Sequence, residues 1–232
     1  MTWIKICGTT NREDALAAVD AGCDAIGFVF GASPRQVSAS SAQAIAAVLP
    51  ADIAKVGVFS DHSAHNVEEI ARQVGLDVIQ LHGGETAEFA RSLFQDSPDN
   101  RPLIFKAVWM LSGEEQMLRE FASEDVVDGI LLDSAVLRAG CSGQGTELIR
   151  GGTGVTLDWD RARDFASQLG ARTRLVIAGG LNPANVGQAI RTLQPWGVDV
   201  CSGVERSPGV KDHDKLRTFV AAVRMNSGST AA

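Results

Sequence analysis

Residues 3–30, WIKICGTTNREDALAAVDAGCDAIGFVF, hold the unit from which the fold can be predicted. Its two ends, Trp3–Cys7 and Asp24–Phe30, are short apolar runs, which are typical of strands buried on both faces. The segment between them, Asn11–Ala21, carries apolar residues three and four positions apart, which indicates a helix that Asn11 can cap. The stretch therefore predicts a strand, a helix and a second, parallel strand joined by a right-handed crossover.

The same alternation continues to the end of the chain. The further predicted strands are Ala54–Phe59, Asp77–His82, Leu103–Val108, Val127–Asp133, Arg174–Ala178 and Val198–Ser202. The further predicted helices are Ser40–Leu49, Ser63–Val74, Glu85–Phe94, Gly113–Ala122, Asp158–Leu169, Asn182–Leu193 and Asp212–Val223. Eight such units predict an α/β fold, a single-domain (β/α)8 TIM barrel over residues 1–225, with an open doubly wound sheet as the alternative.

Several connections carry local predictions. The glycine-rich insert Ser134–Gly154 is expected to be a mobile loop, and residues 226–232, which are small and polar, a disordered tail. The dipeptide Asn182-Pro183 places proline at a first helical turn, and Pro208-Gly209-Val210 is a candidate start for a short extra helix.

Composition narrows the class of protein. Among the 232 residues, 45% are hydrophobic, and 21 Lys and Arg stand against 28 Asp and Glu, for a net charge of −7. An acidic chain without a basic block is a poor candidate for nucleic-acid binding. No apolar run approaches the ~18 residues of a membrane helix, and no secretory signal peptide is visible at the N-terminus. The four cysteines are far apart, so we expect free thiols, inert packing as their default role, and a cytoplasmic location.

In a barrel of this kind the chemistry lies at the carboxyl ends of the strands. Cys7 ends the first strand and Asp133 the sixth, so their side chains can face each other across the mouth of the barrel. A thiolate of lowered pKa can act as a base, and a carboxyl of raised pKa can act as a general acid. The alternatives are that Cys7 is core packing and that Asp133 caps a loop.

Other strand ends offer binding groups. Arg35 can bind a carboxylate, or it can be a solvated loop charge, and His82 is more often a hydrogen-bonding residue than a catalyst. The glycines after strands seven and eight suggest a phosphate cradle, although they can also simply close tight turns. His62 and His65 have no third ligand in the sequence, so a helix cap is preferred to a metal site.

At these residues the chain resembles the phosphoribosylanthranilate isomerase family, from about residue 3 to residue 224. The matching pieces are Lys5-Ile6-Cys7-Gly8, Gly27-Phe28-Val29-Phe30, Ser33-Pro34-Arg35, Gln80-Leu81-His82-Gly83, Leu131-Leu132-Asp133-Ser134, Gly151-Gly152-Thr153-Gly154, Ala178-Gly179-Gly180-Leu181, Ser202-Gly203-Val204-Glu205 and Ser207-Pro208-Gly209-Val210-Lys211-Asp212. The first and last of these pieces, in the same order, make the resemblance specific.

The resemblance implies a TIM barrel and a cofactor-free Amadori rearrangement in L-tryptophan biosynthesis. N-(5-phosphoribosyl)anthranilate would become 1-(2-carboxyphenylamino)-1-deoxyribulose 5-phosphate, with Asp133 as general acid and Cys7 as general base. No metal would take part, and the partners would be the small-molecule substrate and, at most, a second copy of the chain, without nucleic acid or membrane. The expected substrate-binding residues are Arg35, Gln80, His82 and Gly154, and Gly154 also matches the phosphate-gripping loops together with Gly179, Gly180, Ser202 and Gly203.

Three positions depart from the family pattern. Val155 follows the Gly-Gly-Thr-Gly motif where lysine is frequent, Cys201 precedes Ser202 where Ser-Ser is common, and the loop Val136–Arg150 is long. The competing interpretations are a histidine-pathway isomerase, against which Cys7 argues because that enzyme is expected to carry aspartate there, and a catalytically silent phosphosugar-binding barrel. An interaction scaffold has no exposed motif in its favour.

Overall fold

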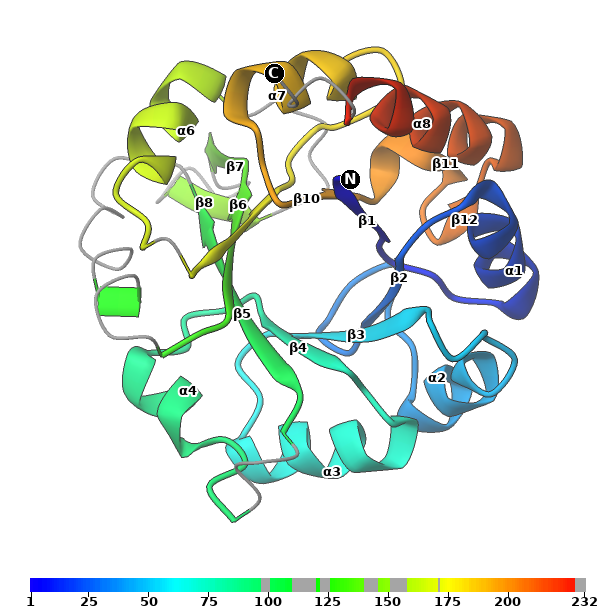
Figure 1. Cartoon of the computed structure of the whole chain (residues 1–232). Helices are drawn as coiled ribbons and strands as arrows, with labels where there is room; N and C mark the ends of the chain where they lie inside the picture. The colour runs from blue at the N-terminus through cyan, green and yellow to red at the C-terminus, as the bar shows by residue number, and fades with distance from the viewer. Residues whose placement is uncertain are drawn as a thin grey trace.

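The computed structural model describes residues 1–96, 101–109, 120–121, 126–139, 146–150, 158–170 and 172–227. Eight parallel strands close into a barrel in the order β1-β10-β9-β6-β5-β4-β3-β2 (Figure 1). The strands are β1 (Trp3–Ile6), β2 (Ala25–Val29), β3 (Ala54–Phe59), β4 (Val78–Leu81), β5 (Leu103–Trp109), β6 (Gly129–Asp133), β9 (Arg174–Ile177) and β10 (Gly197–Val200). Because β1 pairs with both β2 and β10, the TIM barrel is confirmed and the open sheet is excluded.

Helices surround the strands on all sides (Figure 1). Those within the described residues are α1 (Arg12–Ala21), α2 (Ala39–Ala46), α3 (Ala64–Val74), α4 (Ala87–Ser92), α6 (Trp159–Ala166), α7 (Val186–Leu193) and α8 (His213–Asn226). The predicted cap is confirmed, since the Asn11 side chain accepts a hydrogen bond from the Asp14 N–H. The predicted helix Gly113–Ala122 lies almost wholly outside the described residues.

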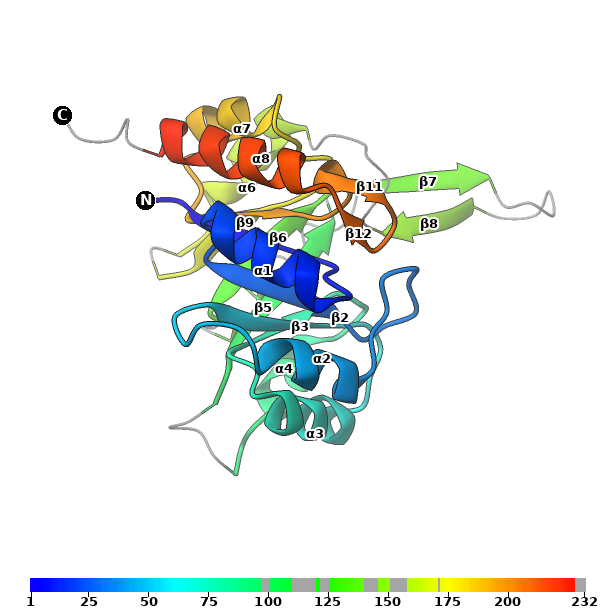
Figure 2. The same cartoon turned by 90° about the vertical axis from the view of Figure 1, so that its right-hand side faces the viewer.

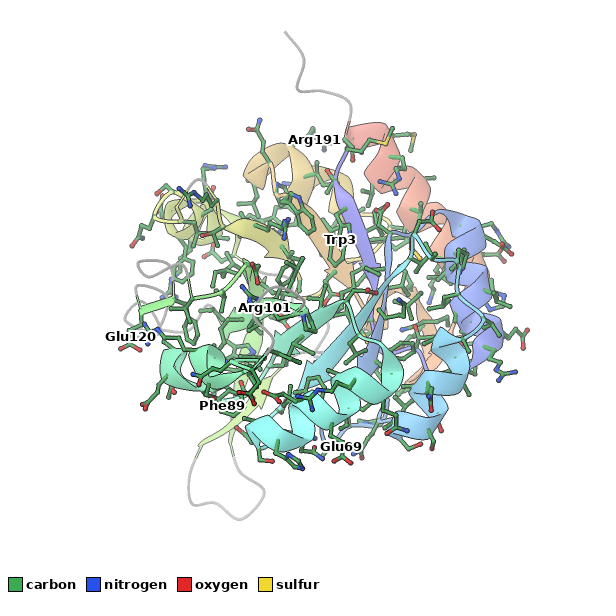
Figure 3. The ribbon with its side chains drawn as sticks, turned by 60° about the horizontal axis from the view of Figure 1, so that its bottom comes forward. Trp3, Glu69, Phe89, Arg101, Glu120 and Arg191 are labelled. Atoms are coloured by element: carbon green, nitrogen blue, oxygen red, sulfur yellow. The ribbon has the colours of Figure 1, made fainter. Side chains whose placement is uncertain are left out.

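Helix α3 shows how local sequence positions these outer elements. The Ser63 side chain caps its first turn, and Gly75 ends it in the left-handed conformation. Val67, Ala71 and Val74 are its buried residues, which the 3.6-residue period brings to one face. Glu69 lies on the outer side of the helix, away from the strands (Figure 3). The helix is therefore held by a narrow apolar stripe packed against the barrel.

The amino-terminal end of the barrel is closed by aromatic side chains. The ring of Trp3 (Figure 3) lies 4.9 Å from that of Trp196 and 6.2 Å from that of Phe105, measured between centroids. Above them, small and branched side chains from six strands fill the interior. Because successive side chains of a strand alternate between faces, Lys5 and Cys7 share the inward face of β1 with Trp3. The opposite, carboxyl end is the one left open for chemistry.

The insert after Asp133 is wrongly predicted as a loop. It forms an antiparallel hairpin of β7 (Ala135–Ala139) and β8 (Thr146–Arg150), which projects from the carboxyl end of the barrel (Figure 2). The glycine-rich residues 140–145 connect the two strands, and the flanking segments carry enough apolar and β-branched residues to pair. The prediction of a loop relied on the glycine content of the insert and did not consider the strand-forming residues on either side of the glycines.

Three further predictions need adjustment at the end of the chain. Pro208 and Gly209 do not start a helix, because they connect the short antiparallel strands β11 (Glu205–Ser207) and β12 (Val210–Lys211). The extra helical turn, η2 (Ser202–Val204), comes before them and directly follows β10. Helix α7 begins at Val186 and not at Asn182, with Pro183 in the preceding turn. Helix α8 includes Asn226, and residues 228–232 lie outside the described residues.

Across the parts of the chain that the structure describes, no helix has the length and apolar character needed to cross a bilayer.

Candidate active site

A cavity of about 540 Å³ opens at the carboxyl end of the barrel. Its lining includes Cys7, Arg35, Gln80, His82 and Asp133, so it brings together residues predicted from four separate strand ends. A smaller hollow of about 40 Å³ adjoins it, lined by the other set of predicted residues, Gly179, Gly180 and Ser202 among them. Asp133, Asp199 and Cys201 line both spaces. The two hollows therefore share a wall that carries two carboxyl groups and a thiol.

Cys7 follows the last residue of β1, and its side chain points into this cavity. A hydrogen bond from the Cys201 thiol and the positive charge of Lys5 lower the pKa of Cys7 to about 7, although burial and the charge of Asp199 act in the opposite direction. By contrast, burial raises the pKa of Cys23, which lies outside the site, to about 12. The environment of Cys7 thus favours a thiolate near neutral pH.

Lys5 and Asp199 form an ion pair in the interior beside Cys7. The two side chains are almost wholly buried, and Lys5 Nζ lies 2.9 Å from Asp199 Oδ2. Burial opposes the charge of Lys5, but the negative charges of Asp199 and Cys7 and the hydrogen bonds to them together outweigh it and raise the pKa of the ammonium. The sequence analysis did not assign a role in the site to Lys5 or to Asp199. A signal was available, because each is a charged residue in an otherwise apolar strand, Lys5 two residues before Cys7 and Asp199 two residues before Cys201.

Asp133 is the last residue of β6 and is only 6% exposed. Burial, followed by the negative charges of Asp199 and Cys7, raises its pKa to about 7, although the Ser134 N–H, 2.7 Å from Oδ1, partly stabilises the carboxylate. His82 Nε2 lies 3.6 Å from Asp133 Oδ2, and its Nδ1 is 3.0 Å from Gln80 Nε2. Asp133 can therefore hold a proton at neutral pH within reach of the cavity.

Arg35 lies in the loop after β2 and is already paired within the protein. Its Nε donates to both carboxylate oxygens of Glu205 at 2.9 and 3.1 Å, and its Nη2 donates to Oε2 at 2.7 Å. The buried Lys211 Nζ, 3.0 Å from Glu205 Oε1, fixes the same carboxylate. Burial alone would raise the pKa of Glu205, but Arg35 and Lys211 hold it below its usual value. In the sequence, Glu205 and Lys211 were noted only as parts of the family motifs. In the structure, Glu205 fixes the position of Arg35, and Lys211 fixes that of Glu205.

The glycines after β9 and β10 lie where a side chain cannot. Gly179 has a φ of +77°, and a Cβ there would lie 2.5 Å from the Ser134 backbone nitrogen. A Cβ at Gly203 would lie 1.9 Å from the Leu181 carbonyl oxygen. Ser202 and Gly203 form the first turn of η2. These close backbone approaches can present N–H groups to an anion. Gly154 lies outside the described residues.

The buried polar atoms of the site favour a polar ligand. Two residues that line the cavity, Gln80 and Asp199, each have a buried oxygen, Oε1 and Oδ1 respectively, without a hydrogen-bond partner among the described residues. Buried polar groups are normally satisfied, so two such atoms at one cavity indicate partners that a substrate can supply.

Comparison with known proteins decides the family. The family model described as N-(5'phosphoribosyl)anthranilate (PRA) isomerase matches residues 4–222. The chain belongs to the PRA isomerase family. It is 43% identical over 226 residues to the N-(5'-phosphoribosyl)anthranilate isomerase of Pseudomonas fluorescens (strain SBW25), with 97% of each chain covered.

Solved structures of PRA isomerases agree with this assignment. The crystal structure of monomers generated from the dimeric enzyme of Thermotoga maritima is 34% identical, with a TM-score of 0.78 over 97% of this chain and 100% of that chain. A PRA isomerase in complex with reduced 1-(o-carboxyphenylamino)-1-deoxyribulose 5-phosphate is 35% identical, with the same TM-score and the same coverage. The resemblance found in the sequence is confirmed, and the chain is an isomerase of tryptophan biosynthesis.

Proposed function

We propose that Asp133 and Cys7 are the general acid and general base with which this chain converts N-(5-phosphoribosyl)anthranilate into 1-(2-carboxyphenylamino)-1-deoxyribulose 5-phosphate. The observation that carries the assignment is that both side chains line one cavity and both have a pKa near 7. Proton transfer at neutral pH requires such matched groups, one holding a proton and one lacking it.

The reaction divides between the two residues. Asp133 protonates the ribose ring oxygen, and the ring opens to a Schiff base. The Cys7 thiolate then removes the proton from the ribose C2, and the resulting enolamine tautomerises to the ketone. The iminium cation of the open form acidifies this C2–H, so a thiolate of pKa about 7 is a sufficient base and no metal or organic cofactor is required.

The remaining residues of the site hold the substrate. The glycine loops, Gly179 and Gly180 with Ser202 and Gly203, take the phosphate in the small hollow, and Gly154 is expected to complete this grip. Gln80 and His82 lie on the opposite side of the cavity with Arg35, where they contact the anthranilate half. Because Glu205 occupies the Nε side of Arg35, the arginine would meet a substrate carboxylate from its remaining face.

Partner and location complete the proposal. Cys7, Cys23 and Cys201 are free thiols, which suits the reducing cytoplasm in which we expect the enzyme to act. Its partner is the small-molecule substrate, and it acts as a monomer or homodimer without nucleic acid or membrane.

The fluorescence of phosphoribosylanthranilate tests this function directly. Purified protein should accelerate its decay when excess indoleglycerol-phosphate synthase removes the product, and pretreatment with EDTA should leave the rate unchanged. A folded protein that binds a reduced product analogue without turnover would instead be a silent binding barrel. A rate lost to EDTA and restored by a metal ion would refute the cofactor-free reaction.

The pH dependence follows from the two shifted groups. The value of kcat/KM should form a narrow bell centred near pH 7, because Cys7 loses its base form below its pKa and Asp133 loses its proton above its own. Beyond the central region each limb should fall about tenfold per pH unit. Steady-state rates across this range, in buffers of constant ionic strength, measure the profile. A plateau extending well to either side of neutral pH would contradict the assignment.

A further inference from the structure

The second cysteine of the site, Cys201, stands beside Cys7 on the neighbouring strand. Ile6 and Val200 are register partners of β1 and β10, and the Cys7 N–H donates to the Val200 carbonyl at 2.8 Å. Each cysteine is the next residue beyond this pair. Neighbouring strands lie about 4.7–4.9 Å apart, which falls within the ~4.4–6.8 Å that separates the Cα atoms of disulfide-linked cysteines. The backbones are therefore already at disulfide distance.

The two sulfur atoms also face each other. The Cys201 side chain interacts with that of Cys7 and lowers its pKa, and Cys201 Sγ also lies 3.8 Å from Glu205 Oε1, the other acceptor available to its single proton. Two glycines leave the room that the sulfurs fill. A Cβ at Gly8 would lie 2.9 Å from Cys201 Sγ, and a Cβ at Gly27 would lie 3.0 Å from Cys7 Sγ. A cross-link at this position would form by rotation of the two cysteine side chains.

A small oxidant has access to both atoms, because both cysteines line the 540 Å³ cavity. Cys7 also faces the positive charge of Lys5, which helps to lower its pKa. Cys201 keeps its proton, because its interaction with Cys7 and its burial raise its pKa more than the charges of Lys211 and Arg35 lower it. Thiolate character and access are the two conditions for oxidation of a cysteine, and a neighbouring thiol that can resolve the first product completes a redox pair.

We propose that Cys7 and Cys201 form a reversible disulfide when a hydroperoxide enters the empty active site, and that this modification switches catalysis off. In the first step the Cys7 thiolate attacks one peroxide oxygen of hydrogen peroxide, the O–O bond breaks, and Cys7 sulfenic acid and hydroxide are formed. In the second step the Cys201 sulfur attacks Cys7 sulfur and displaces hydroxide, which leaves as water with the Cys201 proton. The two sulfurs lose two electrons in total and the peroxide gains them.

The disulfide removes the Cys7 thiolate that acts as the base, and at the same time it protects Cys7 from irreversible oxidation. A sulfenic acid that meets no thiol can be oxidised further to sulfinic acid, which thiols do not reduce. Because Cys201 captures the sulfenic acid first, the oxidised enzyme stays on the part of the pathway that a dithiol reverses.

The test exposes the reduced full-length chain to hydrogen peroxide, removes the peroxide with catalase, and then adds dithiothreitol. We expect most of the activity to disappear and to return with dithiothreitol, together with a peptide that links Cys7 to Cys201 in non-reducing mass spectrometry. In Cys201→Ser, measured relative to its own untreated activity, the loss should not return, and Cys7 should carry sulfinic acid. The matched controls Cys23→Ser and Cys141→Ser should behave as the unaltered chain.

Two results would overturn the proposal. One is oxidation without a Cys7–Cys201 peptide, and the other is full recovery of activity in Cys201→Ser. Thermal unfolding of each variant before treatment establishes that it is folded. The linked peptide is detected independently of turnover, so a disulfide that forms without loss of activity would overturn both the switch and the role of Cys7 as the base, on which the switch rests, and would leave only the disulfide itself.

Discussion

Asp133→Asn is expected to lower kcat by about two to four orders of magnitude, the usual contribution of a positioned acid or base. Asparagine keeps the size of the side chain and its contact with the Ser134 N–H, but it has no proton to give to the ribose ring oxygen. Without that proton the ring does not open, and Cys7 has no activated C2–H to attack. Turnover of phosphoribosylanthranilate, followed by its fluorescence, measures the loss.

The stability of this variant separates a chemical effect from a structural one. The pKa of Asp133 is raised from 3.8 to about 7 in the folded chain, so the unfolded chain binds this proton less tightly than the folded one. The contribution of Asp133 to stability is therefore present at low pH and is lost as the pH rises through about 7. Asparagine does not ionise, so at pH above ~8 its Tm should equal or exceed that of the unaltered chain.

A matched control for Asp133→Asn is available on the surface. Asp160 lies in the first turn of α6, with 90% of its side chain exposed, and Asp160→Asn should retain normal turnover. Normal turnover in Asp133→Asn would assign the acid to another residue, for which His82, 3.6 Å from Asp133, is the nearest choice.

The barrel could be predicted from the sequence because its signal is repeated. Each strand carries its own apolar run, and each connecting helix its own stripe, so an error in one element does not change the fold. Where a segment has no such redundancy, prediction was weaker. The β7–β8 hairpin forms a two-stranded sheet of its own, and the residues between its strands are rich in glycine, a composition typical of a loop. The prediction at Pro208-Gly209 failed for a similar reason, because this dipeptide is as compatible with a turn between two strands as with the start of a helix.

Cys7 and Asp133 could be proposed from position alone, since each ends a strand. The shifts in their pKa values could not be predicted, because they are caused by Lys5, Asp199 and Cys201, whose positions relative to Cys7 and Asp133 depend on the folded structure. Asp199 influences both groups, since its negative charge raises the pKa of Asp133 and also that of Cys7. Lys5 acts in the other direction on both, and its ion pair with Asp199 moderates the field. The sequence shows that a strand contains a charged residue, but it does not show which atoms that residue faces in the folded chain.

The shared field also explains why the two pKa values meet. A thiol and a carboxyl ordinarily titrate several pH units apart, with the carboxyl lower. Burial, together with the negative charges around it, raises the pKa of Asp133, whereas a thiol hydrogen bond and the Lys5 charge lower that of Cys7. Each group also titrates under the influence of the other, so the measured pH profile belongs to the pair.

Cys7→Ser is expected to produce a loss of kcat as large as that of Asp133→Asn while the chain stays folded. A serine hydroxyl has nearly the shape of the thiol, but it remains protonated beside Lys5 at neutral pH and cannot accept the C2 proton. Two observations together identify the cause. KM should change far less than kcat, because binding depends on the glycine loops and the opposite wall of the cavity, and circular dichroism should be unchanged.

The interaction between the two groups supplies the decisive readout for Cys7→Ser. The negative charge of Cys7 contributes to the raised pKa of Asp133, so its removal should shift the alkaline limb of the residual pH profile to lower pH. Cys23→Ser, a buried thiol outside the cavity, provides the control and should keep both rate and profile. Residual turnover in Cys7→Ser within a few-fold of normal would show that the C2 proton goes to another base. A large loss with an unmoved alkaline limb would separate Cys7 from Asp133, because a thiolate that removes the C2 proton must also be felt by the acid that opened the ring.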